Sequence, residues 1–382
     1  MNIKRISKVI VLYKGNEVGK IALTNDDLMA FEYSDNWISE GFSISPFSLP
    51  LEKRVFIAKA DPLDGTFGIF ADSLPDGWGR LLLDRTLSLQ GVNPNSIDAL
   101  TRLSFVGTSG MGALEYKPET LIESDFNWLD FDMIAQECSN ILSGNTSEYK
   151  NCDFDKLFAL GGSSGGARPK VLTKINDEDW IVKFASSVDD INIGKQEYEI
   201  SKIATKSGLK MSETKLIPSK ICSGYFATKR FDRISADGKI DKAHMASAGA
   251  LLETTHRIPN LEYELLFKLT DVLTHNAVDR EQLYRLMCFN IFIGNRDDHA
   301  KNFSFLYDDV KDEWHLAPAY DLTQNSGSFG ERATTVNGKG RAIQIDDIVG
   351  VGANAGLSES KAKNIAEEIF NIVKDANMLD CE

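Results

Sequence analysis

Gly294-Asn295-Arg296-Asp297-Asp298-His299-Ala300-Lys301-Asn302 is the stretch that decides the fold. An apolar segment of helical periodicity precedes it, and two alternating runs, 303–307 and 314–317, follow it as a predicted hairpin. The stretch therefore predicts a loop between a helix and a hairpin, with a carboxylate and an amide five positions apart at Asp297 and Asn302. Taken alone, this pair also fits an ordinary turn whose side chains cap backbone groups.

A third residue, Asp321, makes the spacing of Asp297 and Asn302 more informative. It lies nineteen positions after Asn302, just beyond the predicted hairpin, in the run Ala319 to Leu322. The order is that of protein-kinase catalytic residues, in which the first Asp accepts the proton of the substrate hydroxyl and the Asn and second Asp bind magnesium. We predict these roles for Asp297, Asn302 and Asp321. For Asp321, a helix N-cap is the alternative.

The two residues after Asp297 are ambiguous from the sequence. For His299 we favour a structural hydrogen-bonding role over acid–base work, and Asp298 receives no role.

A glycine-rich segment, LGGSSGGARPK at 160–170, precedes the first strand of a strand-rich block. Glycines let backbone N–H groups approach phosphate oxygens closely. The segment matches neither a Walker A loop nor the kinase G-x-G-x-x-G, and a flexible linker is the alternative. We predict that it binds nucleotide phosphates through Gly162, Ser163, Ser164, Gly165, Gly166 and Ala167.

Lys183 lies in a strand-like run, Trp180 to Phe184, that resembles the V-A-I-K strand whose lysine contacts nucleotide phosphates. An exposed strand lysine is the alternative. Its predicted carboxylate partner is Glu197, on the apolar face of the following helix, with Glu199 as the competitor. A later strand would join the two lobes and offer its groups to the nucleotide base, through Lys229, Arg230 and Phe231.

Composition bounds the class of protein. The chain has 382 residues, 42% of them hydrophobic, and a net charge of −14, which opposes the positive field that non-specific nucleic-acid binding requires. Its five cysteines are scattered and none stands in a C-x-x-C pair, so neither a disulfide framework nor a zinc cluster is indicated. Without a secretory h-region or an apolar run of about 18 residues, we expect a cytoplasmic protein that does not enter a membrane.

The chain divides into three predicted parts. A hairpin of two strands, 9–13 and 18–23, and a helix, 78–89, are predicted within residues 1–118. A connecting helix, 126–143, and a sheet with one inserted helix, 194–207, follow in 119–235. Helices dominate 236–382, with one predicted over 358–374. A sheet with one helix followed by a helical part is the arrangement of the small and large lobes of a protein kinase.

Together these residues resemble the HipA family of bacterial serine/threonine kinase toxins over nearly the whole chain. Phe70 to Arg80 resembles that family's F-x-x-L-L-P-D-G motif, and Val106 to Leu114 its V-G-x-D-x-x-G-A-L segment, with Thr108 or Ser109 in place of the usual Asp. The resemblance implies an α+β fold: a divergent two-lobed protein-kinase-like fold with a β-rich N-terminal accessory domain.

Further motifs match residue by residue. The family's G-A-Q-x-K matches Gly166 to Lys170, and its R-F-D-R matches Arg230 to Arg233. Its catalytic D-x-H-x-K-N matches Asp297 to Asn302, which adds His299 and Lys301 to the predicted nucleotide-binding residues. Members autophosphorylate a serine of the glycine-rich loop and thereby switch off ATP binding. The matching serine is Ser163, with Ser164 as the alternative.

The resemblance implies a Mg- and ATP-dependent serine/threonine protein kinase that acts as a toxin. It would arrest growth by phosphorylating a component of translation, an aminoacyl-tRNA synthetase by analogy. A small helix-turn-helix antitoxin of the HipB kind is the implied partner, and DNA would be contacted only through it. Two other functions stay open: a small-molecule phosphotransferase, and a kinase-like binding module that acts with an antitoxin without catalysis.

Overall fold

The computed structural model describes residues 5–121, 130–143, 154–161, 165–236, 239–255, 257–258, 260–327 and 330–380. Contacts between Cα atoms divide the chain into two compact units. The first comprises Met1–Lys195 and Thr214–His244, and the second comprises Gln196–Glu213 and Met245–Glu382. The predicted limits at 118 and 235 stay predictions.

The first unit opens with an antiparallel five-stranded sheet in the order β4-β3-β2-β1-β5. Its strands are β1 (Lys8–Tyr13), β2 (Asn16–Leu23), β3 (Met29–Tyr33), β4 (Val55–Ile57) and β5 (Leu114–Lys117). The predicted hairpin between β1 and β2 is confirmed: Tyr13 faces Asn16, and Lys14 and Gly15 between them have φ of 48° and 83°. Two positive φ angles are what a two-residue hairpin turn requires.

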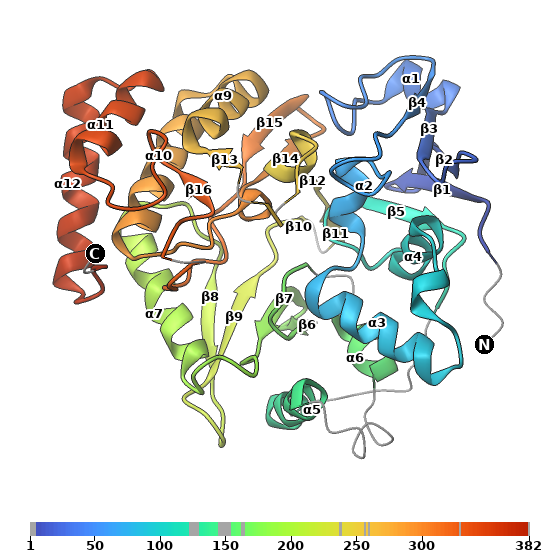
Figure 1. Cartoon of the computed structure of the whole chain (residues 1–382), viewed down its shortest axis with the longest axis horizontal. Coiled ribbons are helices and arrows are strands. Elements are labelled where there is room, and N and C mark those ends of the chain that lie inside the picture. Colours follow the sequence, from blue (N-terminus) through green and yellow to red (C-terminus); the bar gives the residue numbers. More distant parts are fainter. Residues whose placement is uncertain are drawn as a thin grey trace. The chain divides into compact units, whose positions relative to one another are not determined.

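Four helices belong to this N-terminal part (Figure 1): α1 (Asp35–Glu40), α2 (Gly68–Ser73), α3 (Gly77–Leu89) and α4 (Ala99–Val106). The predicted helix 78–89 is therefore confirmed as α3. We call the segment up to Lys117, with its five-stranded sheet and these four helices, the accessory domain.

A second antiparallel sheet, which we call the small-lobe sheet, has the order β6-β7-β9-β8. Its strands are β6 (Lys170–Ile175), β7 (Glu178–Lys183), β8 (Thr214–Ile217) and β9 (Tyr225–Lys229), and the hairpin β10 (Arg233–Ala236) and β11 (Lys239–Lys242) follows. The inserted helix is α7 (Ile193–Lys206), close to its predicted limits.

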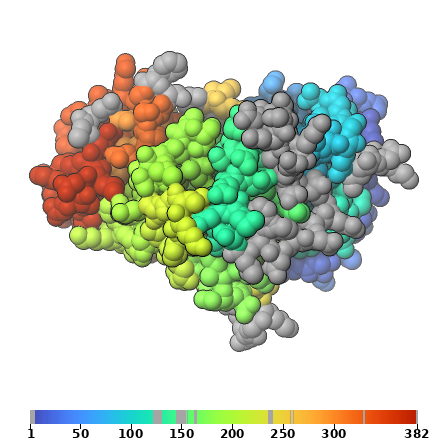
Figure 2. Space-filling view, turned by 90° about the horizontal axis from the view of Figure 1, so that it is seen from below, coloured from blue at the N-terminus to red at the C-terminus, as the bar shows by residue number. Residues whose placement is uncertain are grey.

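The connecting helix is α5 (Phe131–Ser143), and a further short helix, α6 (Phe154–Gly161), leads to β6. The predicted helix included 126–130, of which 126–129 lie outside the described residues. Asp132 ties α5 to the segment between β8 and β9, because its carboxylate accepts from Ser219 Oγ at 2.6 Å and Tyr225 OH at 2.8 Å. The two segments lie side by side on the surface in Figure 2.

The accessory domain and the small-lobe sheet share one apolar core. Trp78, Leu82 and Leu83 of α3 are buried in a single cluster with side chains of the sheet, among them Trp180 and Val182 of β7. Burial of such large side chains contributes about 1.5–3 kcal/mol each. The two parts of the first unit therefore stabilise one another.

The second unit combines a three-stranded sheet, in the order β12-β14-β15, with a helical body. The elements are β12 (His244–Ser247), α8 (Ala248–Leu251), β13 (Leu261–Glu262), α9 (Tyr263–Thr274), α10 (Ala277–Phe292), β14 (Ser304–Asp308), β15 (Glu313–Leu316), β16 (Thr334–Thr335), α11 (Ile345–Asn354) and α12 (Glu359–Asp375). Figure 1 shows α10, α11 and α12 packed together. On α12 the buried residues recur at helical spacing, at Ala362, Ile365, Ala366, Ile369 and Val373.

Three of the five cysteines lie among the described residues. Cys138, Cys222 and Cys288 are free thiols. No helix in the described ranges is long and apolar enough to cross a membrane.

A buried polar network holds the loop that follows α10. The Asp298 side chain is 0% exposed, and its carboxylate accepts from Tyr263 OH at 2.7 Å and from the Thr334 N–H at 3.2 Å. Burial raises the pKa of Asp298 to about 7, although the Arg332 guanidinium and these hydrogen bonds oppose the rise. Burial of a carboxylate disfavours its charged form, which explains the direction.

This pKa predicts a pH dependence of stability that Asp298→Asn should remove. Between its ordinary pKa of 3.8 and about 7, folded Asp298 keeps a proton that the unfolded chain has released. Its contribution to the free energy of unfolding must therefore fall as pH rises through this window, by at most about 1.4 kcal/mol per pH unit. Urea unfolding at pH 5 and pH 7 measures the difference.

The exposed Asp375 near the end of α12 offers a matched control, since Asp375→Asn should keep the wild-type pH dependence. If the free energy of unfolding changed equally with pH in wild type and Asp298→Asn, burial would not shift the pKa of this carboxyl group.

Candidate active site

The predicted catalytic loop places two neighbouring aspartates in opposite surroundings. Asp297 is exposed, whereas Asp298 is fully buried in the network with Tyr263 and Thr334. Because Asp298 is fixed inside the unit, the backbone turns the Asp297 side chain outward. An exposed carboxylate on a fixed loop can meet a hydroxyl group of a substrate.

Asn302 folds back over this loop. Its amide nitrogen donates to the Asp297 carbonyl oxygen at 2.8 Å, and the His299 N–H donates to the same oxygen at 2.9 Å. With its nitrogen so engaged, the amide of Asn302 has its oxygen as the atom to offer a cation. The ligand role of Asn302 stays a prediction.

His299 caps the short 3₁₀ helix η3 (Ala300–Asn302): its Nδ1 accepts from the Lys301 N–H at 3.3 Å. The sequence favoured such a hydrogen-bonding role for this side chain over acid–base work. Contacts of His299 and Lys301 with a nucleotide stay predictions.

Tyr320 connects Asp321 to the catalytic loop. Its hydroxyl group donates to the Lys301 carbonyl oxygen and lies 2.6 Å from Ser304 Oγ. Asp321 itself has φ of 56°, a left-handed conformation that Asp tolerates better than most residues. Residues 321–326 form no helix, so the alternative of a helix N-cap at Asp321 is wrong.

Asn302 and Asp321 would contribute an amide oxygen and a carboxylate to a metal ion. Oxygen donors of this kind suit magnesium, which is usually held by one or two carboxylates and keeps waters and phosphate oxygens as its other ligands. Among the residues that the structure describes, no group of three or more His, Cys, Asp or Glu side chains could hold a metal ion. An amide oxygen and a carboxylate are donors that fit a magnesium ion whose other ligands are water and phosphate.

The glycine-rich segment is described in part. Gly162, Ser163 and Ser164 lie outside the described residues, while Gly165, Gly166 and Ala167 are exposed. Lys170 is buried, and its ammonium group donates to the Gly165 carbonyl oxygen. The described end of the segment is thus held from within the first unit, and phosphate binding by the segment stays a prediction.

Lys183 ends β7, directly opposite Lys170 of β6, with its Nζ 5.6 Å from the centre of the Phe226 ring. Glu197 on α7 is buried, as are Ile200 and Ala204, which confirms the apolar face predicted for this helix. Lys183 belongs to the first unit and Glu197 to the second. Their pairing stays a prediction, as does the competing role of Glu199.

The basic side chains of the segment predicted to contact the nucleotide base form hydrogen bonds with other residues of the first unit. Lys229 Nζ donates to Glu178 Oε1, and the Arg230 guanidinium donates to Asp232 and to the Gly110 carbonyl oxygen. Backbone groups of Lys229, Arg230 and Phe231 remain the predicted contacts of the base. The partners of Arg230 lie up to 120 positions away, and no local pattern marks them.

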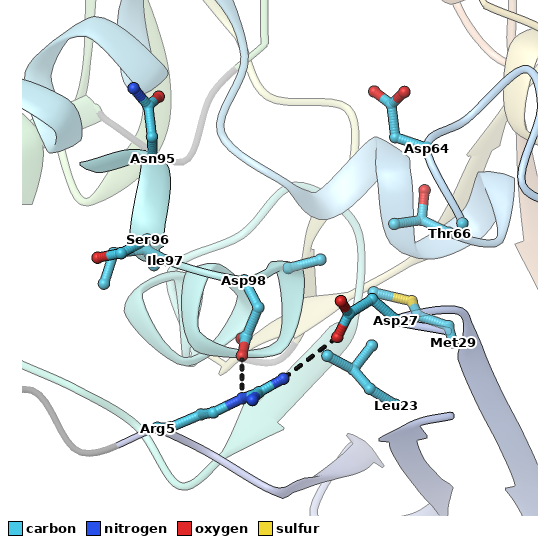
Figure 3. A pocket seen from close by; sticks show the side chains of 12 residues that line it. Arg5, Leu23, Asp27, Met29, Asp64, Thr66, Asn95, Ser96, Ile97 and Asp98 are labelled. Atoms are coloured by element: carbon cyan, nitrogen blue, oxygen red, sulfur yellow. Dashed lines mark hydrogen bonds and ion pairs between the residues drawn. The ribbon is translucent and has the colours of Figure 1, made fainter. Parts of the chain in front are cut away.

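A hollow of about 450 Å³ lies in the accessory domain (Figure 3). Arg5, whose side chain is 73% exposed, donates to Asp27 at 3.2 Å and Asp98 at 3.3 Å, and Asp64 also lines the hollow. Three carboxylates around one guanidinium repel an anionic ligand. This hollow therefore does not suit nucleotide phosphates and is separate from the predicted active site.

Family models match most of the chain. A model of the HipA N-terminal domain matches residues 9–117, and a model of the HipA-like C-terminal domain matches residues 162–376. Two relatives come from Sinorhizobium fredii (strain NBRC 101917 / NGR234). The putative kinase Y4dM is 28% identical over 205 residues, 50% of this chain and 49% of that protein. The putative kinase Y4mE is 25% identical over 349 residues, 82% of this chain and 76% of that protein. The chain thus spans about half the length of the first relative.

A solved structure shares the fold. A chain of the Shewanella oneidensis MR-1 toxin–antitoxin complex of HipA, HipB and operator DNA aligns with a TM-score of 0.71 at 18% identity, over 98% of this chain and 92% of that chain. The predicted fold class, α+β and kinase-like with a β-rich N-terminal domain, is confirmed. Since the C-terminal family model alone covers more than half of the 382 residues and the N-terminal model matches most of the accessory domain, this chain belongs to the HipA family.

Proposed function

We propose that the chain is an ATP- and magnesium-dependent serine/threonine protein kinase of the HipA toxin type. The observation that carries the proposal is the loop 297–302, in which Asp297 is exposed beside the buried Asp298 and Asn302 is folded onto the Asp297 carbonyl oxygen. The ordered residues of a phosphoryl-transfer site accompany this loop in the sequence.

In this proposal, Asp297 accepts the proton of the attacking hydroxyl group. Lys183, supported by Glu197, and the glycine-rich segment hold the phosphates in line with that hydroxyl group. Asn302 and Asp321 hold magnesium, which neutralises charge on the transferred phosphoryl group when bound. Positioning and electrostatic stabilisation supply most of the rate enhancement in reactions of this class.

The biological setting of the proposal follows from the family. The Shewanella oneidensis chain was solved in a complex with HipB and operator DNA. We propose that this chain likewise binds a small antitoxin of the HipB kind in the cytoplasm and reaches DNA only through it, in keeping with its net charge of −14. Its proposed substrate is a protein of the translation machinery, by analogy an aminoacyl-tRNA synthetase.

Asp297→Asn should reduce phosphoryl transfer at least about 100-fold, because it removes the base without changing the size of the side chain. The measurement is transfer of label from ATP to the chain and to proteins of a cell extract. Asp375→Asn, the same change at an exposed site outside the loop, should keep wild-type activity. Unchanged labelling by Asp297→Asn, with a wild-type circular dichroism spectrum, would refute the role of this carboxylate.

Asp321→Asn should raise the magnesium concentration for half-maximal activity at least about tenfold, since a charged ligand becomes neutral. Asn accepts the left-handed backbone at this position as Asp does, so the change isolates the charge. A matched control is Asp312→Asn in the turn between β14 and β15, where φ is 55° and the side chain accepts from Tyr307 OH. A magnesium titration that is identical in all three proteins would argue against Asp321 as a ligand.

Incubation with ATP should add phosphate to Ser163, or to Ser164, and thereby lower the affinity for ATP. Peptide mass spectrometry locates the phosphate, and Ser163→Ala with Ser164→Ala should abolish it while preserving transfer to other proteins. Transfer only to small-molecule acceptors would favour a small-molecule phosphotransferase instead. Absence of nucleotide binding would favour a non-enzymatic binding module.

A further inference from the structure

One residue of the glycine-rich segment is bound on both sides by the accessory domain. The Gly166 N–H donates to Asp76 Oδ1 at 2.7 Å, and the Gly166 carbonyl oxygen accepts from the Trp78 N–H at 3.0 Å. Asp76 and Gly166 are 90 positions apart in the sequence. Both backbone polar groups of Gly166 are therefore paired with the start of α3.

The start of α3 is shaped for this contact. Asp76 occupies the N-cap position, yet its side chain makes no capping hydrogen bond to its own helix. Asp at this position ordinarily accepts from the second or third N–H of its helix. Here its carboxylate accepts from Gly166 instead, which indicates that the contact with the glycine-rich segment takes the place of local capping.

Gly77 and Trp78 allow the start of α3 to lie close to Gly166 and keep it in place. Gly77 has φ of 43°, and a Cβ atom at this position would lie 2.4 Å from the Gly166 carbonyl oxygen. Such a distance is shorter than any ordinary contact, so a side chain at Gly77 would force the two segments apart. Trp78 is 1% exposed in the core shared with the small-lobe sheet, which fixes the turn that presents Asp76.

A second contact steadies the neighbouring residue from the other side. Lys170 of β6 is buried and donates its ammonium group to the Gly165 carbonyl oxygen. Gly165 and Gly166 are thus fixed between a strand of the small-lobe sheet and a helix of the accessory domain. A loop that binds phosphate through its backbone gains affinity when its conformation is set before the ligand arrives.

We propose that the turn Asp76-Gly77-Trp78 of the accessory domain holds Gly165 and Gly166, at the described end of the glycine-rich segment, in the conformation that binds nucleotide, with Asp76 as a positioning residue. The inference rests on the proposed kinase function. It assigns the accessory domain a part in nucleotide binding through a charge-assisted hydrogen bond, which is stronger than one between neutral groups.

The test compares Asp76→Ala with Asp76→Asn. Asp76→Ala removes the acceptor and should raise the KM for ATP about five- to tenfold with kcat changed less than about twofold, because the loss falls on binding. Asp76→Asn keeps an acceptor oxygen and should stay within about twofold of the wild-type KM. Asp26→Ala, an exposed aspartate of the same domain, is the control and should behave as wild type.

Two kinetic results would overturn the proposal. An unchanged KM in Asp76→Ala would show that the contact does not position the segment. A lower KM in both variants would show that the Asp76 carboxylate competes with phosphate for the Gly166 N–H and restrains the enzyme. A circular dichroism spectrum and an unfolding midpoint for each variant establish that it is folded.

Hydrogen exchange of the nucleotide-free protein tests the contact without relying on catalysis. In a peptide that covers 165–170, the Gly166 amide should lose protection in Asp76→Ala and keep it in Asp76→Asn. Equal protection in Asp76→Ala and wild type would overturn the proposal. If the wild type bound no ATP, the proposed function would fail, while loss of protection in Asp76→Ala alone would still establish that Asp76 holds the segment.

Discussion

The geometry of the loop 297–302 depends on the buried carboxylate of Asp298. A carboxylate that is removed from water must find partners within the protein, and Asp298 finds them in Tyr263 and Thr334. These partners lie on α9 and β16, so the loop is fixed to two elements that are distant in sequence. With Asp298 held inside, Asp297 faces outward, and the backbone carbonyl group of Asp297 becomes the anchor for Asn302.

Arg332 completes this arrangement from the side of α10. Its guanidinium donates to the carbonyl oxygens of Asn290 and Ile291 in the last turn of that helix and to that of Asn295 in the loop after it. A cation at a helix C-terminus is favoured by the helix dipole and satisfies carbonyl groups that lack partners within the helix. These hydrogen bonds fix the path of the chain between α10 and Asp297.

Asp232 shows the opposite balance in the first unit. Burial raises the pKa of this carboxyl group, but the guanidinium groups of Arg230 and Arg233 lower it more, and the net shift is downward. Asp298 lies near one guanidinium and Asp232 between two, which explains why burial prevails at the first and charge at the second. Arg230 and Arg233 also donate to carbonyl groups of the accessory domain, so the pairing joins that domain to the segment after β9.

Local sequence patterns predict the secondary-structure elements that depend on neighbouring residues. Alternating apolar residues predicted the hairpin of β1 and β2, and helical spacing predicted α3 and α12 close to their observed limits. The sequence leaves Asp298 ambiguous, because two adjacent aspartates read the same whichever of their side chains is buried.

Long-range contacts were beyond such patterns. The sequence predicts Arg230 near the nucleotide base but not its bond to Asp232. It includes Asp76 in the motif from Phe70 to Arg80 but does not indicate Gly166 as its partner. Both partners depend on tertiary packing, which spacing along the chain does not specify.

The apolar core that the accessory domain shares with the small-lobe sheet is also a long-range contact. Side chains of α3, in the accessory domain, and of β7, the strand that carries Lys183, belong to one apolar cluster. Without α3 this cluster would lose Trp78, Leu82 and Leu83, and with them several kcal/mol of apolar burial. The accessory domain therefore completes the hydrophobic core of the sheet as well as bracketing Gly166. On physical grounds it is an integral part of the lobe proposed to bind nucleotide.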